Sequence, residues 1–181
     1  IRPDRQSDFF QWFYYRVVGA CDTALTMAIV NAHEAAYPAG WEGYEALASY
    51  DQEYWFRVPT HYENGQLIIQ HTPEFDGVYY AYFAPYSLDR HQQLLAMVQC
   101  DARCRLRVAG TSLQGRDLDV LQIGNEDAGR CVWITARQHP GESMAEWWME
   151  GLVNRLMDEA DPVSRELLKK AVVYLVPNMN P

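Results

Sequence analysis

The sequence predicts a two-part fold in which an antiparallel β-sandwich precedes an α/β part. Residues 9–84 contain short aromatic and β-branched segments separated by turn residues, a pattern typical of β-sandwiches. Residues 131–176 read as strand, helix, helix and strand, which is the βαβ pattern of a doubly wound sheet. A helix over about 87–100 separates the two patterns, and we expect it to end the first of two domains, 1–100 and 101–181.

The first half carries repeated strand signals. An aromatic run opens it, and a second segment has apolar residues at every other position. Asn64-Gly65 is a dipeptide typical of hairpin turns, and proline and glycine mark residues 38–43 as a loop. The predicted strands cover residues 9–18, 25–30, 54–58, 66–70 and 77–83.

Aromatic side chains are frequent in this half and allow two interpretations. Tyr14, Tyr79, Tyr80 and Tyr82 have rings that can stack on a sugar or a base. The simpler interpretation, which we favour, is that these rings fill the space between two sheets.

The second half begins with a helix and a hairpin. Ser87 precedes apolar residues at helical spacing and has the chemistry of an N-cap. Strand-like residues 105–108 and 118–123 flank the turn-rich connection 110–117, as in a hairpin. Residues 131–135 form a nearly continuous apolar strand, as expected where both faces of a sheet are covered.

Two helices and a last strand follow. A long helix is predicted from about Pro140 to Met157. Asp161 fits the N-cap of another helix, with Pro162 in its first turn. Residues 172–176 are fully apolar and are predicted to form an interior strand of the sheet.

Composition excludes some classes of protein. The 181-residue chain has a formal net charge of −9, which argues against nucleic-acid binding because phosphate binding needs a basic surface. No apolar run approaches the roughly 20 residues that span a bilayer, so we expect no membrane association. The polar residues 1–5 lack a methionine, so we expect the true start upstream. We expect the protein to be cytoplasmic and its four cysteines to be free, reduced thiols; these are Cys21, Cys100, Cys104 and Cys131.

A histidine and a carboxylate lie where the strand 131–135 meets the long helix. His139 and Glu142 are three residues apart, with Pro140 and Gly141 between them. Proline keeps the preceding histidine extended and fits the first helical position. Glu142 then falls in the first helical turn, and both side chains can converge beyond the strand ends, where open α/β sheets bind ligands.

Zinc chemistry explains these two residue types. Imidazole nitrogen and carboxylate oxygen bind Zn²⁺ at about 2.0–2.2 Å. A catalytic zinc needs three protein ligands and an open position for water, and this stretch supplies two. The alternative is an ordinary acidic residue stabilised by the helix dipole. A polar series at every fourth position is consistent with one solvated helix face; it comprises Glu142, Glu146, Glu150, Asn154 and Asp158.

A longer string around the junction carries a family resemblance. Residues 136–143, Ala-Arg-Gln-His-Pro-Gly-Glu-Ser, resemble the first zinc-ligand motif of the M14 zinc carboxypeptidases, and most closely that of the cytosolic carboxypeptidase subfamily. Residues 111–117 resemble the family's Ser-x-x-Gly-Arg hairpin segment, and residues 176–181 resemble its strand-end motif. Residues 79–87 resemble part of the β-sandwich domain peculiar to the subfamily. The resemblance spans nearly the whole chain, in the expected order.

This resemblance implies an α/β carboxypeptidase-like domain with a mixed sheet and a Zn²⁺-dependent metallocarboxypeptidase. Such an enzyme hydrolyses C-terminal residues, in eukaryotic relatives often glutamates, from peptide or protein tails. His139 and Glu142 match the family's first two zinc ligands. The third ligand, the general base and the arginines that hold the substrate lie beyond Pro181 in the family. We therefore expect this chain to contain no catalytic residue and to have little or no activity alone. Its substrate-binding residues are unknown.

Other readings stay open. None of the histidines that precede the motif matches the missing ligand; these are His33, His61, His71 and His91. The chain is alternatively a module whose aromatic sandwich binds peptides or proteins without catalysis. It is also consistent with a fragment that has no function of its own and associates through an unfinished sheet edge. The sequence leaves the oligomeric state open.

Overall fold

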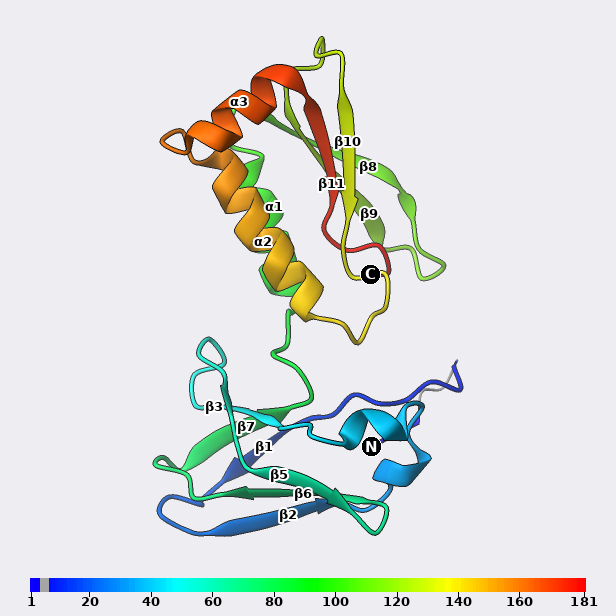
Figure 1. The fold of residues 1–181 in the computed structure, drawn as a ribbon, viewed down its shortest axis with the longest axis vertical. Coiled ribbons are helices and arrows are strands. Elements are labelled where there is room, and N and C mark those ends of the chain that lie inside the picture. The colour runs from blue at the N-terminus through cyan, green and yellow to red at the C-terminus, as the bar shows by residue number, and fades with distance from the viewer. Residues whose placement is uncertain (4–6) are drawn as a thin grey trace. The chain divides into compact units, whose positions relative to one another are not determined.

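Two units, residues 1–84 and 85–181, make up the computed structural model, which describes residues 1–3 and 7–181 (Figure 1). The fold class expected from the sequence is confirmed, because antiparallel sheets form the first unit and a mixed sheet with helices forms the second. Part of the polar stretch at residues 1–5 lies outside the described residues.

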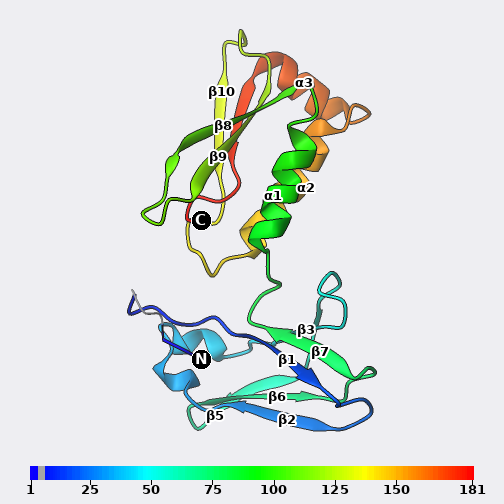
Figure 2. The same cartoon turned by 180° about the vertical axis from the view of Figure 1, so that it is seen from behind.

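The first unit is a sandwich of two antiparallel sheets, seen from both sides in Figures 1 and 2. Its core lies between them, where Val78 and Tyr80 of one sheet and Leu67 and Ile69 of the other are fully buried. One sheet has the order β1 (Tyr14–Val18), β7 (Gly77–Ala81), β3 (Leu47–Ser49) and β4 (Phe56–Arg57). The other has the order β2 (Leu25–Ile29), β6 (Gln66–His71) and β5 (Thr60–Glu63).

Local signals in this unit explain some elements and miss others. Asn64 and Gly65 have φ angles of 49° and 80°, which suits the two-residue turn that joins β5 to β6. The stretch expected to be a loop at residues 38–43 contains the 3₁₀ helix η2 (Pro38–Trp41), and another, η1 (Ala32–Glu34), precedes it. The fully buried Trp41 indole links the two 3₁₀ helices, since it donates a 2.9 Å hydrogen bond to the Ala32 carbonyl.

The second unit contains a four-stranded mixed sheet. Its order is β10 (Cys131–Thr135), β11 (Val172–Val176), β9 (Asp117–Gly124) and β8 (Cys104–Thr111). β10 and β11 run parallel, whereas β9 is antiparallel to both of its neighbours. The prediction that residues 172–176 form an interior strand is confirmed. Its partners β10 and β9 both precede it in the sequence.

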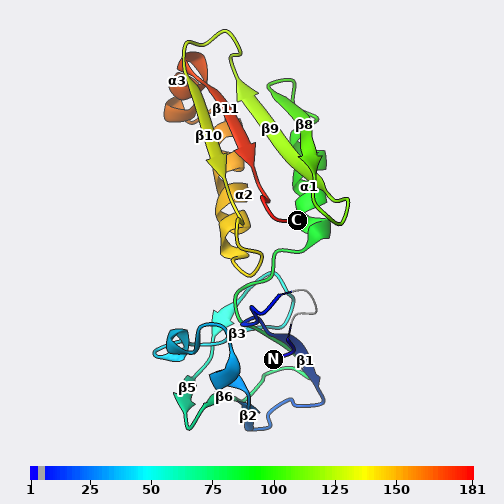
Figure 3. The ribbon, with the colours of Figure 1, turned by 90° about the vertical axis from the view of Figure 1, so that its right-hand side faces the viewer.

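All three helices of the second unit lie on one face of this sheet (Figures 1 and 3). They are α1 (Leu88–Val98), α2 (Met144–Met157) and α3 (Pro162–Lys170). Ser87 caps α1 and Asp161 caps α3, as predicted. The expectation of a doubly wound sheet with both faces of residues 131–135 covered is wrong within the described residues. Trp133 of β10 remains 59% exposed on the other face, where it stacks on Tyr174 of β11.

The helix α1 belongs to the second unit, whereas we expected it to end a first domain at residue 100. Its apolar side, Leu94, Leu95 and Val98, is buried in the same core as α2 and the sheet. The physical reason is that an amphipathic helix packs against whichever apolar surface buries its apolar stripe. The order of elements in the sequence does not reveal which surface that is.

Replacement of Gly124 by alanine is expected to destabilise the second unit. Gly124 has φ of 102°, and an added Cβ would lie 2.6 Å from the Ala171 carbonyl oxygen and 3.1 Å from a Leu168 methyl group. Backbone strain and overpacking together predict a loss of about 2–4 kcal/mol in the free energy of unfolding, measured by denaturant titration. Gly129 has open space around it, so Gly129→Ala is the control and should change stability by less than about 0.5 kcal/mol. Equal effects would contradict the strain argument.

Candidate metal centre

The segment after β10 forms a turn before the helix begins. The Glu142 N–H donates to the His139 carbonyl at 3.0 Å, so residues 139–142 close a β-turn. The helix starts at Met144, and the prediction that Pro140 occupies its first position is wrong. A Pro-Gly pair is better suited to the centre of a β-turn than to a helical start, which explains the difference.

The two predicted ligands share this turn. His139 and Glu142 are both exposed, and within residues 1–3 and 7–181 neither side chain makes a hydrogen bond or an ion pair. The same residues contain no group of three or more histidine, cysteine, aspartate or glutamate side chains placed to hold a metal. The turn therefore offers one imidazole and one uncommitted carboxylate, a donor pair that suits zinc but does not complete a site.

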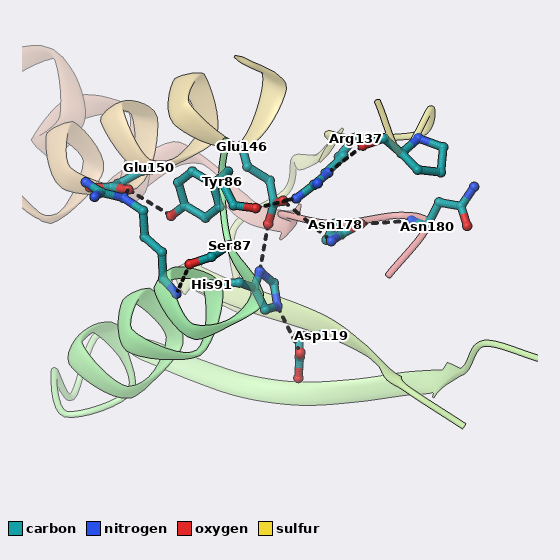
Figure 4. A network of polar contacts seen from close by, with 11 residues as sticks. Tyr86, Ser87, His91, Asp119, Arg137, Glu146, Glu150, Asn178 and Asn180 are labelled. Carbon is teal, nitrogen blue, oxygen red and sulfur yellow. Dashed lines mark hydrogen bonds and ion pairs between the residues drawn. The ribbon is translucent and has the colours of Figure 1, made fainter. Parts of the chain in front are cut away.

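Arg137 ties this turn to the rest of the unit (Figure 4). Its Nε donates to the Pro140 carbonyl at 3.0 Å, and its Nη1 donates to the Tyr86 carbonyl at 2.9 Å. The same Nη1 forms an ion pair with Glu146 of α2. Arg137 also has φ of 48°, a left-handed conformation that costs a non-glycine residue about 1–2 kcal/mol. The side-chain contacts hold the backbone in this conformation.

Glu146 is the centre of a buried charged cluster. Its side chain is 1% exposed and accepts hydrogen bonds from Arg137 and from His91 Nδ1 of α1, the latter at 2.8 Å. The other ring nitrogen of His91 lies 3.2 Å from Asp119 of β9. Asn178 follows β11 and lies 3.5 Å from Glu146. Figure 4 shows these side chains converging from α1, α2 and β9 and from the segments that follow β10 and β11. Two carboxylates thus face two cationic groups in a nearly dry interior.

The pKa of His91 is raised above its ordinary value. Burial alone lowers it, but hydrogen bonds to Glu146 and Asp119, together with their negative charges, outweigh burial. The raised pKa favours the imidazolium form, in which His91 can donate one hydrogen bond to each carboxylate.

A second arginine–glutamate pair joins the same helices one turn further along α2. Arg90 of α1 donates to both carboxylate oxygens of Glu150, at 2.9 and 3.0 Å, and its guanidinium lies 3.9 Å from the Trp147 ring centroid. Tyr86 also donates to Glu150, at 2.8 Å. The pKa of Glu150 is lowered, chiefly by Arg90 and against the effect of burial. The hydrogen bonds between Arg90 and Glu150 include no residue of the 139–142 turn.

The polar series on α2 is not one solvated face. Glu146 is buried and Glu150 is half-buried, whereas Asn154 and Asp158 are exposed. The i, i+4 spacing is real, but its second and third members, Glu146 and Glu150, contact His91, Arg137 and Arg90 instead of facing water. The sequence contained one signal for this cluster, since His91 occupies a position in the apolar stripe of α1.

The other residues that we considered lie elsewhere. Tyr80 is fully buried and Tyr82 packs against the core, as the core-filling interpretation predicts. Tyr14 is 44% exposed and stacks on Tyr79. Three of the other histidines have neighbours in the first unit; His33 lies near Glu34, His61 near Glu63 and His71 near the Tyr80 hydroxyl. All four cysteines are free thiols, and only Cys104 is buried.

Comparison with known proteins identifies the class of this fold. Residues 1–83 match the family model of the cytosolic carboxypeptidase N-terminal domain, and residues 92–181 match that of the zinc carboxypeptidases. A metallo-carboxypeptidase from Pseudomonas aeruginosa, solved in complex with (2-guanidinoethylmercapto)succinic acid, is 47% identical with a TM-score of 0.94. That similarity covers 99% of this chain and 48% of the Pseudomonas chain. The fold is thus that of a metallocarboxypeptidase with an N-terminal β-sandwich.

Two relatives agree with this class. An uncharacterised protein from Zymomonas mobilis is 49% identical over 100% of this chain, which covers 47% of that protein. Cytosolic carboxypeptidase 2 from Danio rerio is 30% identical over 94% of this chain, which covers 28% of that protein. The chain belongs to the M14 zinc carboxypeptidase family, with the N-terminal domain of its cytosolic carboxypeptidase subfamily. The chain spans about half the length of the Zymomonas relative and less than a third of the length of the Danio relative.

Proposed function

We propose that these residues belong to a zinc-dependent metallocarboxypeptidase that hydrolyses C-terminal residues of peptides or proteins. The observation that carries the proposal is the turn after β10, where two exposed side chains of the right type have no partner among residues 1–3 and 7–181. Its place in a domain of the zinc carboxypeptidase family supports the assignment. His139 and Glu142 would hold Zn²⁺ through an imidazole nitrogen and a carboxylate oxygen.

A bound zinc would polarise the scissile carbonyl and lower the pKa of a bound water. The chain's own residues supply two ligands and keep them on one turn, whose conformation Arg137 supports through the Pro140 carbonyl. The described residues contain no third ligand beside them. We therefore propose that the 181 residues alone bind zinc weakly and hydrolyse peptide bonds slowly or not at all, because no general base is assigned among them.

Peptide or protein C-terminal tails are the proposed substrates, and glutamate is the first residue to test. Glutamate is chosen because the chain is similar to a cytosolic carboxypeptidase, and the family resemblance implies removal of C-terminal glutamates in eukaryotic relatives. The ligand of the Pseudomonas relative combines two carboxylates with a guanidinium, and a C-terminal arginine also carries a carboxylate and a guanidinium. Arginine is therefore the second C-terminal residue to test.

The test is release of the last residue from matched peptides ending in glutamate or arginine, measured by mass spectrometry on the full-length gene product. We expect zinc-dependent release that a chelator abolishes and added zinc restores. Absence of both zinc and release would contradict the proposal. Metal-free binding of acidic peptides would instead favour a binding module. The candidate surface is the stack of the exposed Tyr14 on the half-buried Tyr79, with Arg16 over the Tyr79 ring.

We place this activity in the cytoplasm, without a nucleic-acid or membrane partner. The match to the cytosolic carboxypeptidase N-terminal domain supports the location, and the net charge of −9 disfavours binding to phosphate backbones. None of the helices within residues 1–3 and 7–181 combines the length and apolar character that crossing a bilayer requires.

A further inference from the structure

The turn that carries His139 and Glu142 has little of its own to keep it in one conformation. Its backbone hydrogen bond from Glu142 to His139 closes a single β-turn, and both residues are exposed to solvent. A metal site needs its ligands held in place before the ion arrives, since ordering them on binding would cost affinity. The contacts that fix this turn must therefore come from neighbouring residues.

Arg137 makes those contacts with one planar group. Its guanidinium reaches the Pro140 carbonyl inside the turn, the Tyr86 carbonyl before α1 and the Glu146 carboxylate at the start of α2. Arginine can serve three acceptors at once because its donors are fixed in a plane, whereas lysine carries a single ammonium. The left-handed φ of Arg137 is a second, independent sign that this position is held by its surroundings.

The acceptor of Arg137 is itself immobilised. Glu146 is 1% exposed and also bonds His91, which in turn contacts Asp119 on β9. A second link runs through the segment after β11, where the Met179 N–H donates to the Ala136 carbonyl at 3.0 Å. Asn180 Nδ2 lies 3.4 Å from the Gln138 carbonyl. The turn is thus tied to α1, α2, β9 and the end of β11.

We propose that Arg137 is a positioning residue for zinc, which acts by holding the 139–142 turn through the Pro140 carbonyl while Glu146, His91 and Asp119 hold Arg137. This inference rests on the proposed function, because it assumes that His139 and Glu142 are ligands. It assigns a role to Arg137 that requires no contact with metal or substrate.

The test makes the same substitution, arginine to lysine, in two arginine–glutamate ion pairs whose glutamates both lie on α2. Arg137→Lys keeps a positive charge beside Glu146 but cannot also serve Pro140 and Tyr86. Arg90→Lys is the matched control, because the hydrogen bonds between Arg90 and Glu150 join α1 to α2 and include no residue of the 139–142 turn. On the full-length gene product, zinc affinity is measured by chelator competition, ligand geometry by the visible spectrum of the cobalt-substituted protein, and folding by thermal unfolding.

Arg137→Lys is expected to weaken zinc binding about 10–100-fold, the range seen when residues that orient metal ligands are changed, and to alter the cobalt spectrum. Arg90→Lys should leave zinc affinity within about twofold, even where both variants lose similar thermal stability. Equal zinc affinity in Arg137→Lys and wild type would overturn the inference, and so would equal weakening by Arg90→Lys.

A second pair of variants covers the case in which Arg137→Lys does not fold. Glu146→Gln keeps the Arg137 bonds to Pro140 and Tyr86, whereas the double variant Arg137→Gln/Glu146→Gln removes them together with both charges. We expect the double variant to bind zinc at least about tenfold more weakly than Glu146→Gln alone, and equal affinities would overturn the inference. If His139→Ala lowers zinc affinity and these variants do not, only the role of Arg137 falls. If wild-type protein binds no zinc, the proposed function falls with it.

Discussion

Replacing His139 by alanine is expected to lower the zinc affinity of the full-length gene product by more than about 100-fold. Loss of a direct ligand should exceed the 10–100-fold effect of changing a residue that only orients a ligand. The loss of Lewis-acid stabilisation, several kcal/mol, predicts a fall in kcat/KM of at least about 10³-fold. Glu142→Ala should behave in the same way. Zinc content by elemental analysis and peptide hydrolysis by mass spectrometry check both variants.

Folding should not confound this result. His139 and Glu142 are exposed and have no side-chain partner within the described residues, so each substitution should change the free energy of unfolding by less than about 0.5 kcal/mol. Gln138→Ala is the matched control, because Gln138 is exposed in the same segment and its side chain is not a candidate ligand. Normal zinc content in His139→Ala, or equal loss in Gln138→Ala, would show that this turn is not the metal centre.

Replacing His91 by phenylalanine is expected to destabilise the protein by about 3–5 kcal/mol, the cost of breaking a buried charged pair. The phenyl ring fills the space of the imidazole but donates no hydrogen bond, so Glu146 loses one of its donors and Asp119 loses its contact with His91. Chemical denaturation measures the effect. His61→Phe is the control, since His61 is half exposed beside Glu63 and should change stability by less than about 0.5 kcal/mol.

The same variant reports the protonation of His91. Because folding raises the pKa of His91, its charged contacts contribute fully at pH values below the unfolded pKa of about 6.5. This contribution decreases as pH rises through the folded pKa, while Arg137 stays charged beside Glu146. The stability gap between wild type and His91→Phe should therefore shrink with rising pH. A gap that widens with rising pH would contradict the imidazolium assignment.

Local chemistry in the sequence predicted many elements correctly. Asn64-Gly65 forms a turn because both positions take positive φ, and Asp161-Pro162 starts a helix because the carboxylate accepts from Val163. The interior strand 172–176 was recognisable from its continuous apolar run. Such signals act over a few residues and need no knowledge of distant partners.

Features that depend on distant partners were missed. Glu146 matches a solvent-facing series by spacing, yet it is buried because His91 and Arg137, which are 55 and 9 residues away, neutralise it. Trp133 lies in an apolar strand that suggests two covered faces, yet one face is exposed because the three helices pack on the other. The two proposed zinc ligands, His139 and Glu142, came from a sequence motif, whereas the residues that support their turn came only from the structure.

A crystal structure of the full-length gene product, with anomalous diffraction data at the zinc absorption edge, tests most directly whether the 139–142 turn is the metal centre. We expect a zinc peak about 2.0–2.2 Å from a ring nitrogen of His139 and from a carboxylate oxygen of Glu142. Arg137 should still donate to the Pro140 carbonyl in that structure. A zinc peak at another site, or none beside His139 and Glu142 in protein that hydrolyses peptides, would contradict this assignment.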